Sequence, residues 1–194
     1  ADVALLYEHG DIDKRYGFVM GGGKPEGAFV PKKEDVVPPC AVKTLPVQDG
    51  DVFDLGGVQI EAIAVPGHTV GTMVYLDRAR RVLYSGDACN ANTLLGLPCS
   101  TTVETYAKSL DHLATYLKGI DKFYGGHGLQ AVPAYIVDEA MILCEEILSD
   151  ADDRFETEFL GRKFLYARKF DGMFHREDGG IANIAYVMEK VYNK

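Results

Sequence analysis

Apolar and polar side chains alternate between residues 58 and 65, and this is the clearest hydrophobic pattern in the chain. A period of two predicts a β-strand, here buried on one face at first and on both faces near its end. Pro66 and Gly67 follow directly and predict where that strand stops. Turn residues before it, and short β-branched stretches at 72–76 and 82–85, predict further strands joined by hairpins.

The second half of the chain has a helical period instead. Apolar residues recur every three or four positions from Tyr106 to Leu117, after a capping-box sequence that begins at Thr101. A second stripe of this kind runs from Val137 to Leu148. Short strands are expected at 122–124, 163–170 and 181–188. Strands mixed with helices in this order favour the α/β or α+β class, with helices packed outside a sheet.

Composition narrows the class of protein. The 194 residues fit one domain, and 47% apolar with 25% charged residues is typical of a folded globule. A net charge of −9 disfavours nucleic acid as a partner. No stretch reaches the roughly 20 consecutive apolar residues of a membrane span. Four cysteines without a CxxC pair suit a reducing compartment, so we expect a cytoplasmic protein, with a disulfide-free periplasmic one as the alternative.

Three polar residues share one kind of position. His68, Asp87 and His127 each lie at the carboxyl end of a short strand, and a glycine precedes each of them. Two imidazoles and a carboxylate at neighbouring strand ends form a ligand set suited to zinc, iron or manganese. Any one of the three alone is more typical of an ordinary turn residue.

The sequences around these residues resemble the three later motifs of the metallo-β-lactamase superfamily. The matching strings are Pro66-Gly67-His68-Thr69-Val70-Gly71-Thr72, Tyr84-Ser85-Gly86-Asp87-Ala88 and Tyr124-Gly125-Gly126-His127-Gly128, in the family's order. The resemblance implies an αββα sandwich that holds one or two metal ions, usually zinc, and activates water for hydrolysis. It also implies that His68 binds the first metal, Asp87 bridges both, and His127 binds the second.

The family's first metal motif, HxHxDH, is not found in this sequence. His9, in Glu8-His9-Gly10-Asp11, lacks the other histidines and is interpreted as a surface residue, and Asp111-His112 as part of a solvated helix face. Because Ala1 begins the chain without Met and within a helical pattern, we expect residues 1–194 to be a single domain that is incomplete at its N-terminus. The remaining four of seven ligands, including a water-orienting Asp, are then expected upstream of residue 1, and the isolated chain is expected to be inactive.

Other residues are candidates for contact with a substrate. His175 lies beside a turn, and Cys89 follows Asp87 by two positions; an exposed turn and core packing are the respective alternatives. Residues 17–33 are rich in Gly and Lys and are interpreted as a flap over the site, with Phe18, Met20 and Phe29 as apolar contacts.

The hypothesis that best joins these observations is a metal-dependent hydrolase of a small-molecule ester, thioester or lactone. Only 39 residues separate Asp87 from His127, which, with the acidic charge, argues against a nuclease of the same superfamily. A non-catalytic binding or assembly protein on the same fold, and an iron-dependent enzyme similar to a sulfur dioxygenase, stay open as alternatives. Exposed sheet edges and apolar faces of an incomplete sandwich also predict a homo-oligomer or a segment-swapped dimer.

Overall fold

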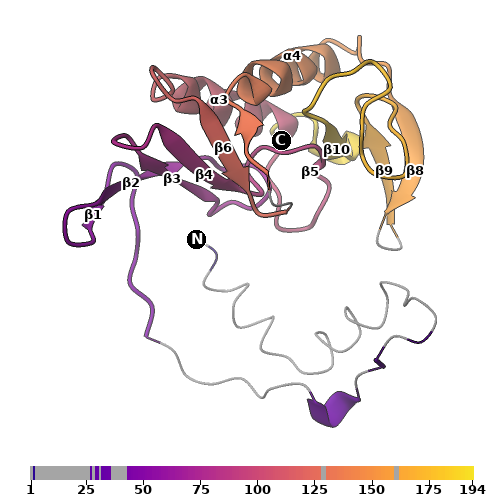
Figure 1. Cartoon of the computed structure of the whole chain (residues 1–194). Helices are drawn as coiled ribbons and strands as arrows, with labels where there is room; N and C mark the ends of the chain where they lie inside the picture. Colours follow the sequence, from indigo (N-terminus) through magenta and orange to yellow (C-terminus); the bar gives the residue numbers. More distant parts are fainter. Residues whose placement is uncertain are drawn as a thin grey trace. The chain divides into compact units, whose positions relative to one another are not determined.

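A computed structural model describes residues 2, 27, 29–30, 32–35, 43–127, 130–159 and 162–194 of the chain (Figure 1). Contacts divide the chain into two compact units, Ala1–Pro46 with Glu158–Lys163, and Val47–Thr157 with Phe164–Lys194. In the first unit the described residues include a short 3-10 helix, η1 (Lys33–Asp35). The helix expected over residues 1–9 and most of the expected flap lie outside the described residues. The second unit holds the residues of the candidate site.

A six-stranded sheet forms the larger part of the second unit. Its strand order is β1-β2-β3-β4-β6-β7. The strands are β1 (Val52–Asp54), β2 (Gln59–Ala64), β3 (Met73–Asp77), β4 (Val82–Gly86), β6 (Lys122–Gly125) and β7 (Val132–Pro133). Strands β1 to β4 are antiparallel neighbours, whereas β4 and β6 are parallel. The hairpins predicted from the turn residues are therefore confirmed, and a crossover through a helix separates β4 from β6.

A smaller sheet has the order β5-β10-β9-β8. Its strands are β5 (Thr93–Leu94), β10 (Ile184–Tyr186), β9 (Arg162–Tyr166) and β8 (Phe155–Phe159), and a 3-10 turn, η2 (Met188–Lys190), follows β10. The two C-terminal strands are shorter than the sequence predicted. The short strand β5 pairs with β10 in parallel, so residues far apart in the sequence are neighbours here.

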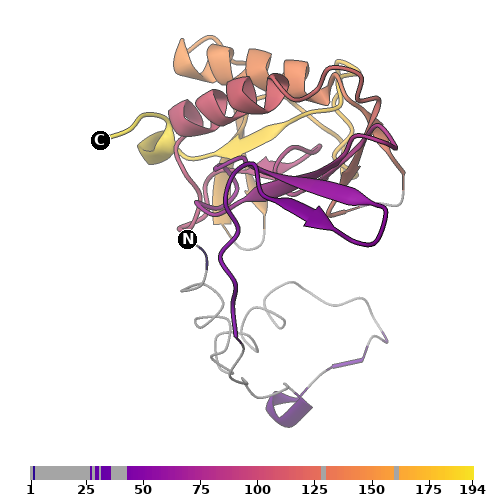
Figure 2. The same cartoon turned by 90° about the vertical axis from the view of Figure 1, so that its left-hand side faces the viewer.

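Two helices, α3 (Val103–Ala114) and α4 (Ile136–Leu148), pack side by side (Figures 1 and 2). Helix α3 begins one residue later than predicted, because the hydroxyl of Thr102, and not of Thr101, accepts the backbone N–H of Thr105. Glu104 pairs with Lys108 instead of closing a capping box. Among the described residues no helix is long and apolar enough to cross a membrane.

One hydrophobic core joins the helices to both sheets. Its fully buried members include Ile63 of β2, Tyr106 of α3, Phe123 of β6, Cys144 of α4 and Tyr186 of β10. This arrangement confirms the mixed α/β architecture that the alternation of strands and helices predicted.

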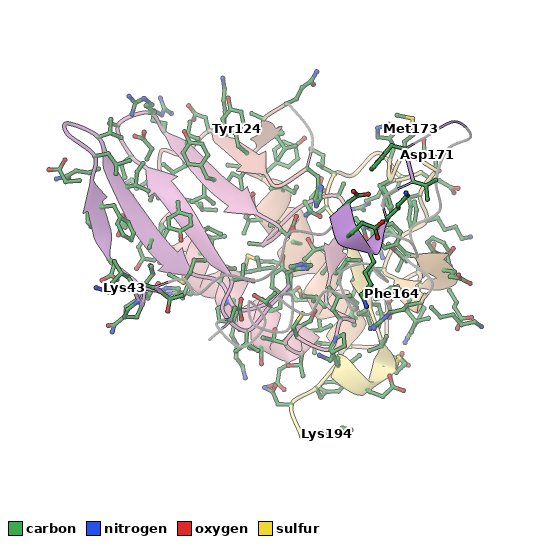
Figure 3. The ribbon with its side chains drawn as sticks, turned by 90° about the horizontal axis from the view of Figure 1, so that it is seen from below. Lys43, Tyr124, Phe164, Asp171, Met173 and Lys194 are labelled. Atoms are coloured by element: carbon green, nitrogen blue, oxygen red, sulfur yellow. The ribbon has the colours of Figure 1, made fainter. Side chains whose placement is uncertain are left out.

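The opposite face of the six-stranded sheet is aromatic and partly exposed. Strand register places Tyr75, Tyr84 and Tyr124 in one row across β3, β4 and β6. Tyr84 is 43% and Tyr124 is 38% exposed, and the view from below, with Tyr124 labelled, looks onto this side of the sheet (Figure 3).

The homo-oligomer expected from the sequence stays a prediction, which light scattering tests.

Candidate metal site

Three polar residues that follow sheet strands meet at one edge of the six-stranded sheet. Asp87 comes directly after β4 and His127 comes shortly after β6. Because these strands are parallel neighbours, with Gly86 paired to Gly125, their carboxyl ends lie together. His68 reaches the same edge from the loop between β2 and β3.

The carboxylate of Asp87 lies between the two imidazoles. His127 Nε2 is 3.3 Å from Asp87 Oδ1, and His68 Nε2 is 4.0 Å from Asp87 Oδ2. Two ligand atoms on one tetrahedral zinc stand about 3.4 Å apart, so the first distance already fits a shared cation. Each carboxylate oxygen of Asp87 therefore faces a different histidine.

Backbone groups orient the imidazole of His68. Its Nδ1 is 3.1 Å from the carbonyl oxygen of Leu94. A carbonyl only accepts, so Nδ1 donates to it, and Nε2 is the ring nitrogen on the side of Asp87. The hydroxyl of Ser100 bonds to the carbonyl oxygen of His68 at 2.7 Å and lies 3.1 Å from that of Leu94.

Glycines next to the ligands allow a close backbone approach. A Cβ on Gly67 would lie 2.4 Å from the ring of Tyr106, and one on Gly126 would lie 2.9 Å from Asp87 Oδ1. Real Cβ atoms do not come this close to other heavy atoms. The glycines therefore let the backbone before His68 approach α3 and the backbone before His127 approach Asp87.

The donor chemistry suits a metal, but the three side chains do not make a complete site. Within residues 43–127, 130–159 and 162–194, no group of three or more His, Cys, Asp or Glu side chains is gathered so as to hold a metal ion. His127 is also 83% exposed, compared with 21% for His68. The residues present thus fit a part of a metal site whose remaining ligands they do not supply.

The structure describes the surroundings of two substrate-contact candidates, Cys89 and His175. Cys89 is only 1% exposed, its Sγ faces the carbonyl of Ile136, and burial raises the pKa of its thiol to about 12. Of the two interpretations that the sequence allowed, the structure therefore supports core packing. His175 is exposed and pairs with Asp171 at 3.2 Å. Phe18 lies outside the described residues.

Of the two histidines that the sequence analysis interpreted as surface residues, the structure describes only His112. His112 is half-exposed and its Nε2 lies 3.1 Å from a carboxylate oxygen of Asp49, so it ties α3 to the turn before β1. His9 lies outside the described residues.

The sequence did not predict which groups contact the candidate ligands. Asn90 Nδ2 lies 3.3 Å from Asp87 Oδ1, and the carbonyl of Leu94 orients His68. The sequence indicated the amide only weakly, because Asn90 is three residues from Asp87 in the same turn. It could not indicate the carbonyl of Leu94, because every residue has a backbone carbonyl.

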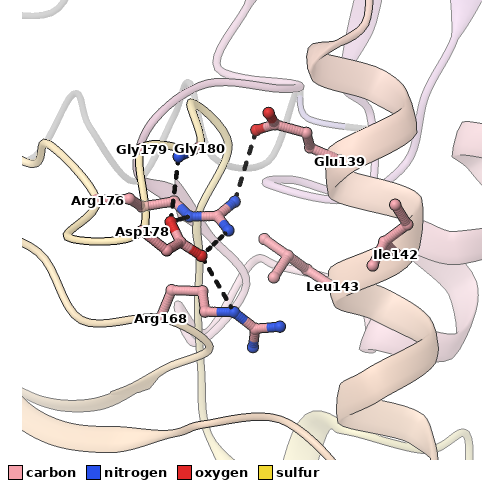
Figure 4. A pocket seen from close by; sticks show the side chains of 8 residues that line it. All are labelled: Glu139, Ile142, Leu143, Arg168, Arg176, Asp178, Gly179 and Gly180. Carbon is pink, nitrogen blue, oxygen red and sulfur yellow. Dashed lines mark hydrogen bonds and ion pairs between the residues drawn. The ribbon is translucent and has the colours of Figure 1, made fainter.

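A separate cavity of about 340 Å³ lies between α4 and the loop that follows β9 (Figure 4). Its lining residues are Glu139, Ile142, Leu143, Arg168, Arg176, Asp178, Gly179 and Gly180. Arg176 bonds to Asp178 at 2.8 Å and lies 3.5 Å from Glu139, and Arg168 pairs with Asp178 and Glu146. Because carboxylates pair both guanidinium groups, this cavity offers no free charge to a ligand, and the candidate metal residues do not line it.

Comparisons with known proteins place the chain in a family. A model of the metallo-beta-lactamase superfamily matches residues 5–127. Acyl-coenzyme A thioesterase MBLAC2 of Bos taurus is 31% identical over 86 residues, which are 43% of this chain and 31% of that protein. Hydroxyacylglutathione hydrolase of Brucella anthropi is 35% identical over 101 residues, 50% of this chain and 36% of that protein.

A crystal structure of a metallo-beta-lactamase family protein from Thermus thermophilus has a TM-score of 0.49, with 23% identity over 75% of this chain and 49% of that one. The chain spans about a third of the length of the curated relatives it matches. The family model nevertheless matches more than half of the chain, and it ends at His127, the last of the three candidate ligands. The chain belongs to the metallo-β-lactamase superfamily.

Proposed function

We propose that this chain is part of a metal-dependent hydrolase that cleaves a small-molecule thioester. The observation that supports the proposal best is the carboxylate of Asp87 between two imidazoles, 3.3 Å from His127 and 4.0 Å from His68. A carboxylate that faces a nitrogen ligand on each side is suited to holding two cations close together, as in binuclear hydrolytic sites.

His68, Asp87 and His127 would hold the metal, with zinc as the best match to their nitrogen and oxygen donors and iron or manganese as alternatives. A bound metal would supply a water of lowered pKa and polarise the carbonyl under attack. The chain's own contribution is orientation: the Leu94 carbonyl keeps the proton of His68 on Nδ1, and the glycine before His127 brings that residue against Asp87.

The thioester substrate is inferred from the relatives. One is named as a thioesterase of acyl-coenzyme A, and the other as a hydrolase of hydroxyacylglutathione. Coenzyme A and glutathione both bear acyl groups on sulfur, so both names describe release of an acyl group from a thiol. An oxygen ester or a lactone is the wider class, since the same attack on a carbonyl cleaves it.

Three ligands do not complete such a site, and the sequence has no HxHxDH motif. We therefore propose that residues beyond these 194 supply the missing ligands, including the Asp that orients the attacking water. On this proposal the isolated chain binds zinc weakly and does not turn over substrate.

The test compares this chain with the product of its complete reading frame. Zinc content is measured by elemental analysis, and hydrolysis of acyl-coenzyme A and acyl-glutathione by release of free thiol. We expect stoichiometric metal and activity only in the complete product, with both lost in Asp87→Asn, which keeps the shape of the side chain. His112→Ala, which removes an imidazole from the far end of α3, is the matched control and keeps both. A complete product without metal, or an active Asp87→Asn variant, would overturn the proposal.

A further inference from the structure

We propose that Asn90 is a positioning residue for Asp87: its side-chain amide holds the carboxylate in the rotamer that faces both histidines. The inference rests on the proposed function, since it assigns a task within that site. It also gives the smaller sheet a role in supporting the site, although none of the candidate ligands lies in that sheet.

The hydrogen bonds fix which way the amide of Asn90 points. The backbone N–H of Asn92 donates to Asn90 Oδ1 at 2.7 Å. A backbone N–H can only donate, so the amide oxygen must be on that side and the NH₂ group on the other. That NH₂ group lies 3.3 Å from Asp87 Oδ1 and donates to it. Two neighbouring groups thus determine the orientation of the amide.

The smaller sheet holds the backbone of Asn90 in place. The N–H of Asn90 donates to the hydroxyl of Thr93 at 3.0 Å, and the carbonyl of Asn90 accepts the N–H of Asn183 at 3.3 Å. Thr93 is the first residue of β5, only 1% exposed, and its own N–H donates to the carbonyl of Asn183. Asn183, directly before β10, therefore holds Asn90, and β10 itself pairs with β5, whose Leu94 carbonyl orients His68.

On this proposal, the orientation of the Asp87 carboxylate depends on its contact with the Asn90 amide. The side chain of Asp87 is 35% exposed, so packing covers it only in part. With Oδ1 held by the Asn90 amide, Oδ2 is left facing His68 and Oδ1 still lies 3.3 Å from His127. A neutral donor orients the carboxylate without cancelling its negative charge, whereas Lys or Arg at this position would compete with a metal cation.

The first experiment measures the rotamer of Asp87 directly in the metal-free 194-residue chain. Three-bond NMR couplings to the β-protons and the carboxyl carbon report χ1. We expect one staggered rotamer in the wild type and an average over rotamers in Asn90→Ala. Asn90→Asp gives the same averaging: it keeps the size of the side chain and the bond to the Asn92 N–H, but turns an oxygen toward Asp87. It also replaces Asn90→Ala if that variant does not fold.

Asn92→Ala is the matched control, because alanine keeps the backbone N–H through which Asn92 contacts Asn90. We expect it to leave the couplings of Asp87 unchanged. A single rotamer that survives in both Asn90 variants, or equal averaging in Asn92→Ala, would overturn the positioning role.

The second experiment measures zinc affinity by competition with a chromophoric chelator. Loss of a hydrogen-bonding partner of a metal ligand typically weakens metal binding by about 10- to 100-fold. We expect a loss of this size in Asn90→Ala and Asn90→Asp, and less than about twofold in Asn92→Ala. Equal losses in all three would contradict the proposal. If neither the wild-type chain nor the complete reading-frame product bound zinc, the proposed function would be refuted. The role of Asn90 would still be decided, separately, by the NMR couplings of Asp87.

Discussion

The two faces of the six-stranded sheet differ sharply, although the same strands build both. On the helix side, Leu76, Leu83 and Phe123 form a row across β3, β4 and β6, and all three are fully buried. On the other side, the row one position along contains Tyr75, Tyr84 and Tyr124, and the latter two are 43% and 38% exposed. One face is thus the core of the unit, and the other is an aromatic surface.

The comparison shows that apolar character alone does not reveal which face of a strand is covered. In β2, Ile60 and Ala62 lie on the side of the tyrosine row, since Ala62 pairs with Tyr75, and Ala62 is fully buried there although it does not belong to the core under the helices. Ile63, which pairs with the fully buried Val74, faces the helices. Tyrosine suits the open side because its ring packs against a neighbour while its hydroxyl stays in water.

The largest expected effect separates two consecutive residues of β6. Phe123→Ala removes a fully buried ring and is expected to lower the free energy of unfolding by about 3–5 kcal/mol. Tyr124→Ala, on the open face, is expected to cost about 1 kcal/mol, mostly through its contact with Tyr84. Urea denaturation measures both. Equal losses would mean that the open face is covered in solution.

The sequence predicted helices α3 and α4 and strands β2, β3, β4 and β6, because their periods are local properties. It did not predict the short strands β5, β7 and β8. The gathering of His68, Asp87 and His127 followed from their shared position after apolar strands. What it did not predict has no local period to reveal it: the pairing of β5 with β10, the contact of Leu94 with the distant His68, and the orientation of the Asn90 amide toward Asp87 within one turn. A backbone carbonyl is present in every residue, and the orientation of a side-chain amide depends on its hydrogen bonds in the folded chain. Neither leaves a pattern in a sequence.

A smaller loss of stability is expected from a substitution at the contact between Gly67 and helix α3. An added Cβ at Gly67 would lie 2.4 Å from the ring of Tyr106, so Gly67→Ala must push helix α3 or the loop bearing His68. We expect a loss of about 1–3 kcal/mol, as is usual when a packed core receives extra atoms. Gly172→Ala is the control, because a Cβ there meets nothing within 4 Å. Thermal denaturation of both variants tests this, and a stable Gly67→Ala would show that the helix side can yield.

The open face should show a weaker, measurable coupling of its own. The rings of Tyr84 and Tyr124 are stacked with centroids 6.0 Å apart. A double-mutant cycle with Tyr84→Ala and Tyr124→Ala is expected to give a coupling of about 0.5–1.5 kcal/mol, the usual value of an aromatic pair. Additive losses in urea denaturation would mean that the two rings do not stabilise each other across the strands.

The smallest effect concerns the turn between β3 and β4, at the rim of the open face. Hydrogen bonds from the side chain and backbone of Arg80 hold the pKa of Asp77 below its usual value. A lowered pKa in the folded state adds stability above the pKa of the unfolded chain, and this gain is lost as the pH falls through the folded value. Asp77→Asn should therefore be less stable than the wild type at pH 7, and the difference should shrink below about pH 4. Phe123→Ala provides the contrast, since a lost ring costs the same at both pH values, and urea denaturation at pH 7 and pH 3 measures both. A deficit of Asp77→Asn that persists unchanged at pH 3 would show that the carboxylate of Asp77 acts through its shape and not through its charge.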